Sequence, residues 1–263
     1  SHLFGRPLAS EEELGERLPK KKALAIFSSD AISSSAYATE EILRVLVLAG
    51  AGAILISLEI AIAISVLLAV VAISYRQLCR AYPNGGGAYA VAKANLGSLA
   101  SLVAAAALLI DYVMTVAVST ASAIAQTYSV IPGLYEFRIE IAVVAIALIT
   151  IANLRGLRES GNIFAVPTYL FVGLALLMVG LGVVRIATGG AVDIQQPDAV
   201  PLGTGTEGIG LFLLLKAFAS GSVALTGTEA IANGVPAFKP PESRNASSTL
   251  VVMAVLLAVL FVG

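Results

Sequence analysis

Seven long apolar segments dominate this sequence of 263 residues and constrain its fold more than any other feature. A helix needs about 20 mostly apolar residues to cross the hydrocarbon core of a bilayer. The segments lie at residues 22–49, 53–79, 97–130, 138–153, 162–188, 207–234 and 247–263. They predict an all-α membrane domain over residues 22–263 that ends within its seventh span. Residues 1–21 are expected to form a cytoplasmic N-terminal segment.

The composition excludes several other classes of protein. Hydrophobic residues make up 58% of the chain and charged residues 13%, whereas soluble domains carry about 25% charged residues. The net charge of −1 provides no electrostatic attraction for nucleic acid. The single cysteine, Cys79, allows no intrachain disulfide. No nucleophilic triad or metal-ligand spacing is found in the sequence, so we expect neither enzyme activity nor a bound cofactor.

Basic residues are concentrated in every second loop, which predicts the orientation in the membrane. The basic group comprises Lys20, Lys21 and Lys22 before the first span, Arg76, Arg80 and Lys93 after the second, Arg155 and Arg158 after the fourth, and Lys239 and Arg244 after the sixth. The alternate loops are nearly free of basic residues. The loop after the first span has no Lys or Arg, the loop after the third has Arg138, and the loop after the fifth has Arg185. Cytoplasmic loops carry the excess of Lys and Arg. We therefore expect a multi-pass protein of the plasma membrane with a cytoplasmic N-terminus.

Two segments rich in serine and glycine, 28–41 and 219–229, interrupt the first and sixth spans. Both residue types weaken helices. The segments also match, since Ala36-Tyr37-Ala38-Thr39-Glu40-Glu41-Ile42 aligns with Leu225-Thr226-Gly227-Thr228-Glu229-Ala230-Ile231. They lie five spans apart and so run in opposite directions. Matching breaks in two inverted halves mark the binding site of a transporter, so we predict that both helices are discontinuous. The alternative is two helices with small residues packed closely on their neighbours.

Acidic residues within the spans are the main candidates for function, because a charge at the bilayer centre is costly. Asp30 lies at the first predicted break, Asp111 in the third span and Glu229 at the second break. Together with nearby hydroxyl groups they suit a cation, which prefers oxygen ligands. The hydroxyl candidates are Tyr37, Tyr112, Thr115 and Thr226. Glu229 and Asp111 are also candidates for proton coupling, because buried carboxylates can exchange protons.

Each of these residues also has a structural interpretation. Asp111 could form an ion pair with Lys216 or a nearby arginine, and Asp30 could cap the second half of a broken helix. The hydroxyl groups could bond to their own helix or pack as ordinary side chains.

Several stretches resemble the amino acid–polyamine–organocation superfamily, and more narrowly the KimA-type potassium importers related to the KUP family. The loop Gly85-Gly86-Gly87-Ala88-Tyr89 resembles the turn that this superfamily has between its second and third helices. The narrower similarity rests on residues 29–41, Ser74-Tyr75-Arg76-Gln77, residues 111–119, residues 153–161 and Thr226-Gly227-Thr228-Glu229.

The resemblance implies a LeuT-type fold of five plus five inverted helices and proton-coupled import of potassium. It also implies that the seven acidic and hydroxyl candidates surround the ion path. Relatives of this type carry a cytoplasmic C-terminal domain through which they form homodimers and respond to cyclic di-AMP, and we expect that domain to be missing from this sequence.

Two other functions stay open at this point. An amino-acid or polyamine permease of the same superfamily is the first. The aspartate at the first predicted break would repel a substrate carboxylate, which favours a cation but does not separate potassium from a small organic amine. The second is a membrane receptor built on a transporter fold, although a receptor has no need of three interior acids.

Overall fold

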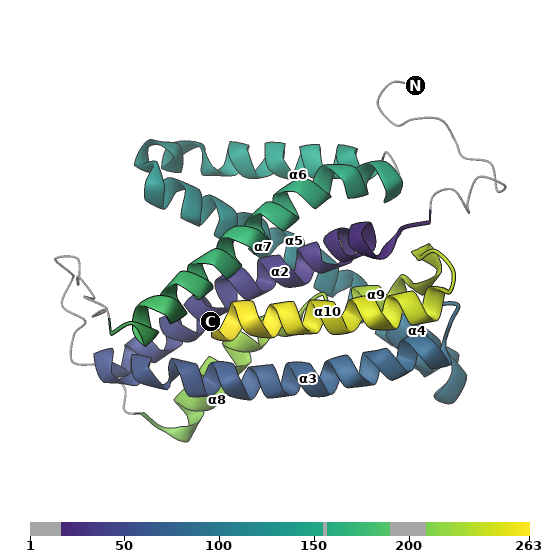
Figure 1. The fold of residues 1–263 in the computed structure, drawn as a ribbon, viewed down its shortest axis with the longest axis horizontal. Coiled ribbons are helices and arrows are strands. Elements are labelled where there is room, and N and C mark those ends of the chain that lie inside the picture. The colour runs from purple at the N-terminus through teal and green to yellow at the C-terminus, as the bar shows by residue number, and fades with distance from the viewer. Residues whose placement is uncertain (1–16, 155–156, 190–208) are drawn as a thin grey trace.

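The computed structural model describes residues 17–154, 157–189 and 209–263, without the side chains of residues 51 and 157–160. Helices make up nearly all of this part of the chain (Figure 1). The α-helices are α2 (Lys20–Leu46), α3 (Ser57–Ala81), α4 (Gly87–Asn95), α5 (Ser98–Val130), α6 (Arg138–Leu154), α7 (Leu157–Ala187), α8 (Leu211–Gly221), α9 (Ala230–Asn233) and α10 (Glu242–Val262). Short 3-10 helices are η2 (Val47–Ala49), η3 (Ala51–Ile56), η4 (Pro132–Phe137), η5 (Ser222–Leu225) and η6 (Val235–Ala237).

Six predicted spans correspond to stretches that are long and apolar enough to cross a membrane. Within the described residues these are Gly52–Ala81, Ser98–Val130, Pro132–Leu154, Gly161–Ala187, Leu211–Asn233 and Glu242–Val262. The first predicted span is α2, which has 27 residues but is not among the six because its sequence is too polar. Its serines are buried or partly buried, since α2 packs against α3, α7, α8 and α10.

The predicted break in the first span is wrong. α2 is a continuous helix from Lys20 to Leu46. Its serines do not compete with the helix, because their hydroxyl groups donate to backbone carbonyls one turn earlier in the same helix. These bonds run from Ser28 to Leu24, from Ser29 to Ile26, from Ser33 to Asp30 and from Ser35 to Ile32.

The break predicted in the sixth span is present. α8 ends at Gly221 and is followed by η5, and the backbone of Thr226 is extended (φ −63°, ψ 140°). Gly227 then adopts a φ of +82°, which L-residues with side chains rarely adopt. The chain resumes helical form only over the four residues of α9. Residues 222–229 therefore interrupt the α-helix with one short 3-10 helix and a turn in the middle of a span, and membrane proteins tolerate such a break only in the protein interior or at a cavity.

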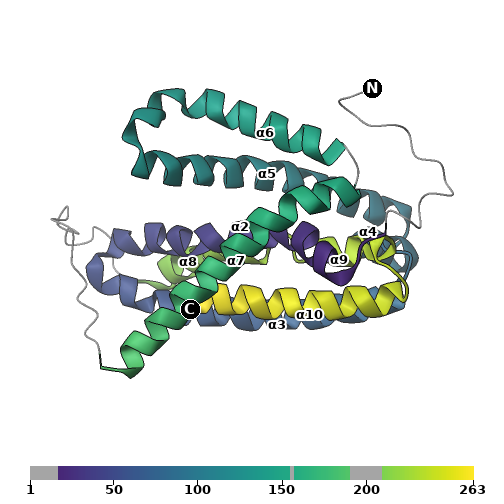
Figure 2. The same cartoon turned by 45° about the horizontal axis from the view of Figure 1, so that its top comes forward.

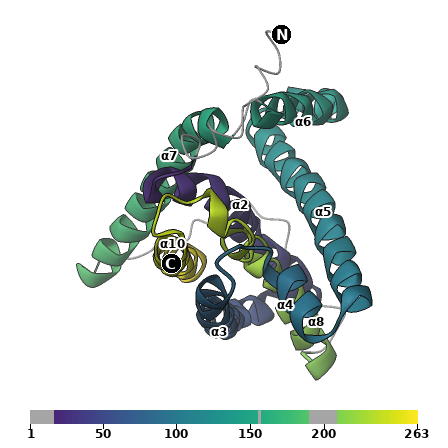
Figure 3. The same ribbon diagram turned by 90° about the vertical axis from the view of Figure 1, so that its right-hand side faces the viewer.

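The core lies between α2, α3, α10 and the two halves of the sixth span. α3 and α10 run side by side, while α7 crosses α2 obliquely (Figures 1 and 2). α5 and α6 form a hairpin that stands away from α3 and α10 (Figure 3). Ser101 is the one buried residue of α5, and α6 has no buried residue. The largest buried side chains include Ile42, Ile64, Ile231, Leu250 and Phe238.

Some sequence predictions fall outside the described residues. They concern residues 1–16, which form most of the predicted cytoplasmic segment, and Arg155. The side chain of Arg158 is also outside the described part.

Candidate ion path

A cavity of about 550 Å³ lies between α2, α5, α6 and α7. Asp30 from α2 lines it together with Tyr112 and Thr115 from α5. These residues approach one another because Asp30 lies in the middle of α2, where α2 contacts α5. The structure thus brings Asp30, Tyr112 and Thr115, three of the predicted site residues, to one cavity.

A second cavity, of about 590 Å³, adjoins the first. Ser29, Ser33 and Ser119 line both cavities, and the hydroxyl groups of Ser33 and Ser119 lie 3.3 Å apart. Tyr37 lines only the second cavity, and its hydroxyl donates to Ser34 at 3.4 Å. Tyr37 therefore lies two helical turns from Asp30, at the level of the second cavity, and three serines and Ala123 line both cavities.

The acid at the sixth-span break approaches Asp30 from the opposite side. Glu229 is 8% exposed and interacts electrostatically with both Asp30 and Asp111. Gly227 touches α2 directly, since a Cβ atom at Gly227 would lie 2.9 Å from the carboxyl carbon of Asp30. Thr226 is the extended residue just before this contact. The three predicted acids therefore share one electrostatic environment, although they come from α2, α5 and the sixth span.

Two carboxylate oxygens in this environment have no hydrogen-bond partner. They are Oδ1 of Asp30 and Oε1 of Glu229, and both atoms are buried. A buried polar atom without a partner is rare in folded proteins and calls for an explanation, such as a bound ion. Within the described residues, no group of three or more acids, histidines and cysteines lies close enough to hold one metal ion. A cation at this point would therefore also need hydroxyl, amide or backbone oxygens.

The structural alternatives for Asp111 and Asp30 are not found. In the described part of the chain, the ion pairs join Arg17 to Glu242 and Arg44 to Glu40 and Glu41. Asp111 is in none of them. Asp30 lies within a continuous helix and caps no helix end.

Sequence reasoning missed two residues at the site. Asn233, at the end of α9, donates from Nδ2 to the Tyr112 hydroxyl at 2.9 Å. Tyr75 of α3 is partly buried and interacts electrostatically with Glu229 and Asp111. Asn233 lies four residues after Glu229, so the helical repeat could have placed the two on one face. Tyr75 belongs to one of the stretches that carry the family resemblance, Ser74-Tyr75-Arg76-Gln77, but it was not predicted to have a role at the site.

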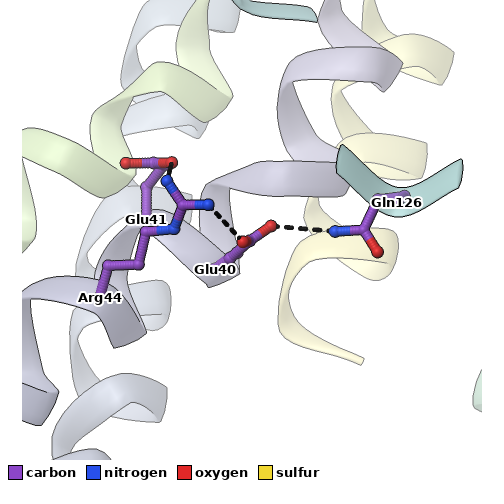
Figure 4. A network of polar contacts seen from close by, with 4 residues as sticks. All are labelled: Glu40, Glu41, Arg44 and Gln126. Carbon is purple, nitrogen blue, oxygen red and sulfur yellow. Dashed lines mark hydrogen bonds and ion pairs between the residues drawn. The ribbon is translucent and has the colours of Figure 1, made fainter. Parts of the chain in front are cut away.

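A polar network borders the second cavity at the level of Glu40 (Figure 4). Arg44 donates to Glu40 at 2.7 Å and pairs with Glu41 at 3.3 Å. Gln126 of α5 donates to the other oxygen of Glu40 at 3.1 Å. Glu40 is ten residues from Asp30, which is roughly 15 Å along a helix. The network joins α2 to α5 far from the buried acids.

These features define a class of protein. Long apolar helices surround two cavities whose mostly apolar walls include serine, tyrosine and acidic side chains, and acids are buried beside a helix break, as in an all-α membrane permease. The chain belongs to the amino acid permease family, whose model matches residues 20–263.

One curated relative narrows the comparison. The chain is similar to the potassium transporter KimA of Bacillus subtilis (strain 168), with 48% identity over 262 residues. The match covers 99% of this chain and 43% of that protein. The chain therefore spans less than half the length of the relative.

Proposed function

We propose that this protein forms the ion path of a secondary transporter that imports potassium ions and couples them to protons. The proposal places it in the plasma membrane with its N-terminus in the cytoplasm, as the basic loops indicate. Similarity to a protein named as a potassium transporter supports the choice of ion. The proposal includes the LeuT-type inverted repeat, with a continuous first helix and a broken sixth.

The observation that carries the proposal is the pair of unbonded carboxylate oxygens on Asp30 and Glu229. They lie beside a stretch of the sixth span whose peptide groups are not in a regular helix. Potassium sites in membranes replace the ion's water shell with protein oxygens. In the proposed mechanism Asp30 contributes negative charge to the ion, with Tyr112, Thr115 and Thr226 as further oxygen donors. Tyr37 serves the adjoining part of the path. Glu229 or Asp111 carries the coupled proton.

The same proposal covers assembly. A cytoplasmic domain beyond these helices would join two copies and bind cyclic di-AMP. This part rests on the sequence resemblance alone.

The test is rescue of a bacterium that lacks its own potassium uptake systems. The full-length gene should restore growth at low potassium, and the cells should take up potassium from the medium. Uptake of amino acids and of a polyamine is measured in the same strain. If growth at low potassium is not restored but the cells take up amino acids or a polyamine, the ion assignment is wrong and the broader permease function replaces it. Absence of all these activities would favour a receptor.

A further inference from the structure

The first turns of α2 and α10 lie side by side at one end of the helices (Figure 2). The backbone N–H of Leu18 donates to the carbonyl of Ala237 at 2.7 Å, and that of Lys239 donates to the carbonyl of Leu18 at 3.0 Å. α2 begins at Lys20 and α10 at Glu242, so both helices run into the bundle from the same end. Basic loops mark this end as the cytoplasmic one.

A cavity of about 270 Å³ lies between these two helices, apart from the cavities of the ion path. It is lined by Lys20, Lys21, Leu24, Ser248, Thr249 and Val252. The lysines are the first two residues of α2, whereas Val252 is ten residues into α10, roughly 15 Å along the helix axis. The wall of the cavity therefore changes from charged at the helix ends to apolar further into the bundle.

We propose that this cavity binds an anionic phospholipid, with the headgroup phosphate at Lys20 and Lys21 and an acyl chain against Leu24 and Val252. Basic pockets between membrane helices on the cytoplasmic side bind anionic lipid headgroups. The inference takes the orientation in the membrane from the proposed function, but it does not depend on the transported solute.

The two lysines have charge available for a ligand. Both residues are exposed, and in the described part of the chain neither forms an ion pair. The acid at the start of α10, Glu242, pairs with Arg17 instead. Two adjacent ammonium groups at the edge of a bilayer attract a phosphate, to which each can donate hydrogen bonds.

Hydrogen bonds hold the walls of the cavity in place around the lysines. The hydroxyl of Tyr169 in α7 donates to the backbone carbonyl of Lys21 at 2.6 Å, which ties the start of α2 to a third helix. The hydroxyls of Ser248 and Thr249 both donate to the carbonyl of Asn245, at 3.0 and 2.8 Å. Because these protons are used within α10, the lysines carry the recognition of the anion.

The apolar part of the cavity favours a lipid over a free phosphate compound. Leu24 is partly buried, and Val252 is 49% exposed. An acyl chain removes such apolar surface from contact with water or headgroups, and a free phosphate gains nothing from it. A lipid whose phosphate meets the lysines has its chains on the bilayer side of the headgroup, along the apolar wall.

The test measures binding to the purified full-length protein in nonionic detergent by native mass spectrometry. The probes are short-chain phosphatidylglycerol, short-chain phosphatidylcholine and glycerol phosphate, which separate an anionic lipid from a neutral one and from a free headgroup. Phosphatidylglycerol should bind the wild-type protein tightest of the three. Equal binding of phosphatidylcholine would overturn the role of the anionic headgroup, and equal binding of glycerol phosphate would overturn the lipid. These two comparisons need no variant, so they decide the proposal even where a substitution prevents folding.

Removal of the lysines tests the headgroup position. K20Q/K21Q should raise the dissociation constant of phosphatidylglycerol roughly 25-fold, or roughly fivefold for each lysine near a membrane surface. R80Q/K93Q is the matched control, because it removes two exposed charges from the loop between α3 and α4, which is also basic. The control should change the constant less than twofold. Equal effects of the two pairs would mean that overall charge and not this cavity attracts the lipid, and the proposal would be wrong.

Filling the cavity tests the position of the acyl chain while both lysines remain. V252F places a ring in the apolar part of the cavity and should raise the dissociation constant of phosphatidylglycerol. V259F introduces the same side chain at another exposed position of α10, outside this cavity, and should leave the constant unchanged. No difference between the two variants would contradict the proposed site. Potassium uptake does not enter these measurements, so a protein that binds the lipid but moves no potassium would refute the proposed function alone.

Discussion

Replacing Gly227 by alanine tests whether the break in the sixth span is built around Asp30. Gly227 has a φ of +82°, and an added Cβ atom would lie 2.8 Å from the backbone nitrogen of Ala31 and 2.9 Å from Oδ2 of Asp30. The carboxylate of Asp30 can rotate away, but the backbone of a continuous helix cannot move without moving α2. We therefore expect G227A to shift the break away from Asp30.

Gly97 provides the control that separates backbone conformation from contact. Its φ is +90°, and an added Cβ atom would meet nothing within 4 Å. A residue with a side chain at such a positive φ costs of order 1–3 kcal/mol, and this cost applies to both glycines. Extra atoms forced into a packed region cost a further 1–3 kcal/mol or so, and this second cost applies to G227A alone. We expect G97A to lower the free energy of unfolding by about 1–3 kcal/mol and G227A by about 2–6 kcal/mol.

Reversible unfolding of the full-length protein in mixed detergent micelles measures both values, and potassium uptake is recorded beside it. G227A should lose most of its uptake at a protein level where G97A keeps it. If the two variants are equally stable and equally active, Gly227 does not approach α2 as described, and the ion path must be assembled differently.

Three other substitutions probe individual charges. Asp30→Asn keeps the shape of the side chain without its charge, so growth rescue should be lost while immunoblots show normal protein in the membrane; rescue by D30N would exclude an ion role. Glu229→Gln cannot exchange a proton, so its remaining uptake should no longer respond to an imposed pH gradient, and a fully retained response would remove Glu229 from the coupling mechanism. Arg44→Gln removes the exposed ion pairs of Figure 4, which should lower the free energy of unfolding by less than about 1 kcal/mol. A larger loss in the same unfolding assay would show that this network holds α2 and α5 together.

The positions of the spans could be predicted from hydrophobicity, because lipid demands long apolar helices. The predicted and observed bounds of the third span, for example, are 97–130 and Ser98–Val130. The combined content of serine and glycine could not predict whether the helix of the first or the sixth span is broken. Serine hydroxyls can bond to their own helix, so the serines of α2 leave it intact. Gly227 allows a positive φ, and the chain turns there. Glycine was thus the informative residue.

The candidate site was predictable as far as it depended on charge. Buried acids are expensive in a membrane. That rule, together with the predicted breaks, selected Asp30, Asp111 and Glu229, which the fold brings within electrostatic range of one another. The partners of these acids depend on packing between distant elements. Asn233 and Tyr112 are 121 residues apart in the sequence, and only the fold brings them within hydrogen-bond distance. Tyr37 was grouped with the acids as a nearby hydroxyl group, but it lines the adjoining cavity.

The matching segments of the first and sixth spans place an acid at the same position but beside different residues. Glu40 and Glu229 occupy equivalent positions in the aligned segments. Four residues after Glu40 comes Arg44, on the same helix face, and it neutralises a side chain that is 37% exposed. Four residues after Glu229 comes Asn233, which supplies hydrogen bonding but no charge. Glu229 is buried with one oxygen unbonded. In the proposed mechanism this oxygen leaves Glu229 free to exchange a cation or a proton, whereas Glu40 is held in an ion pair with Arg44.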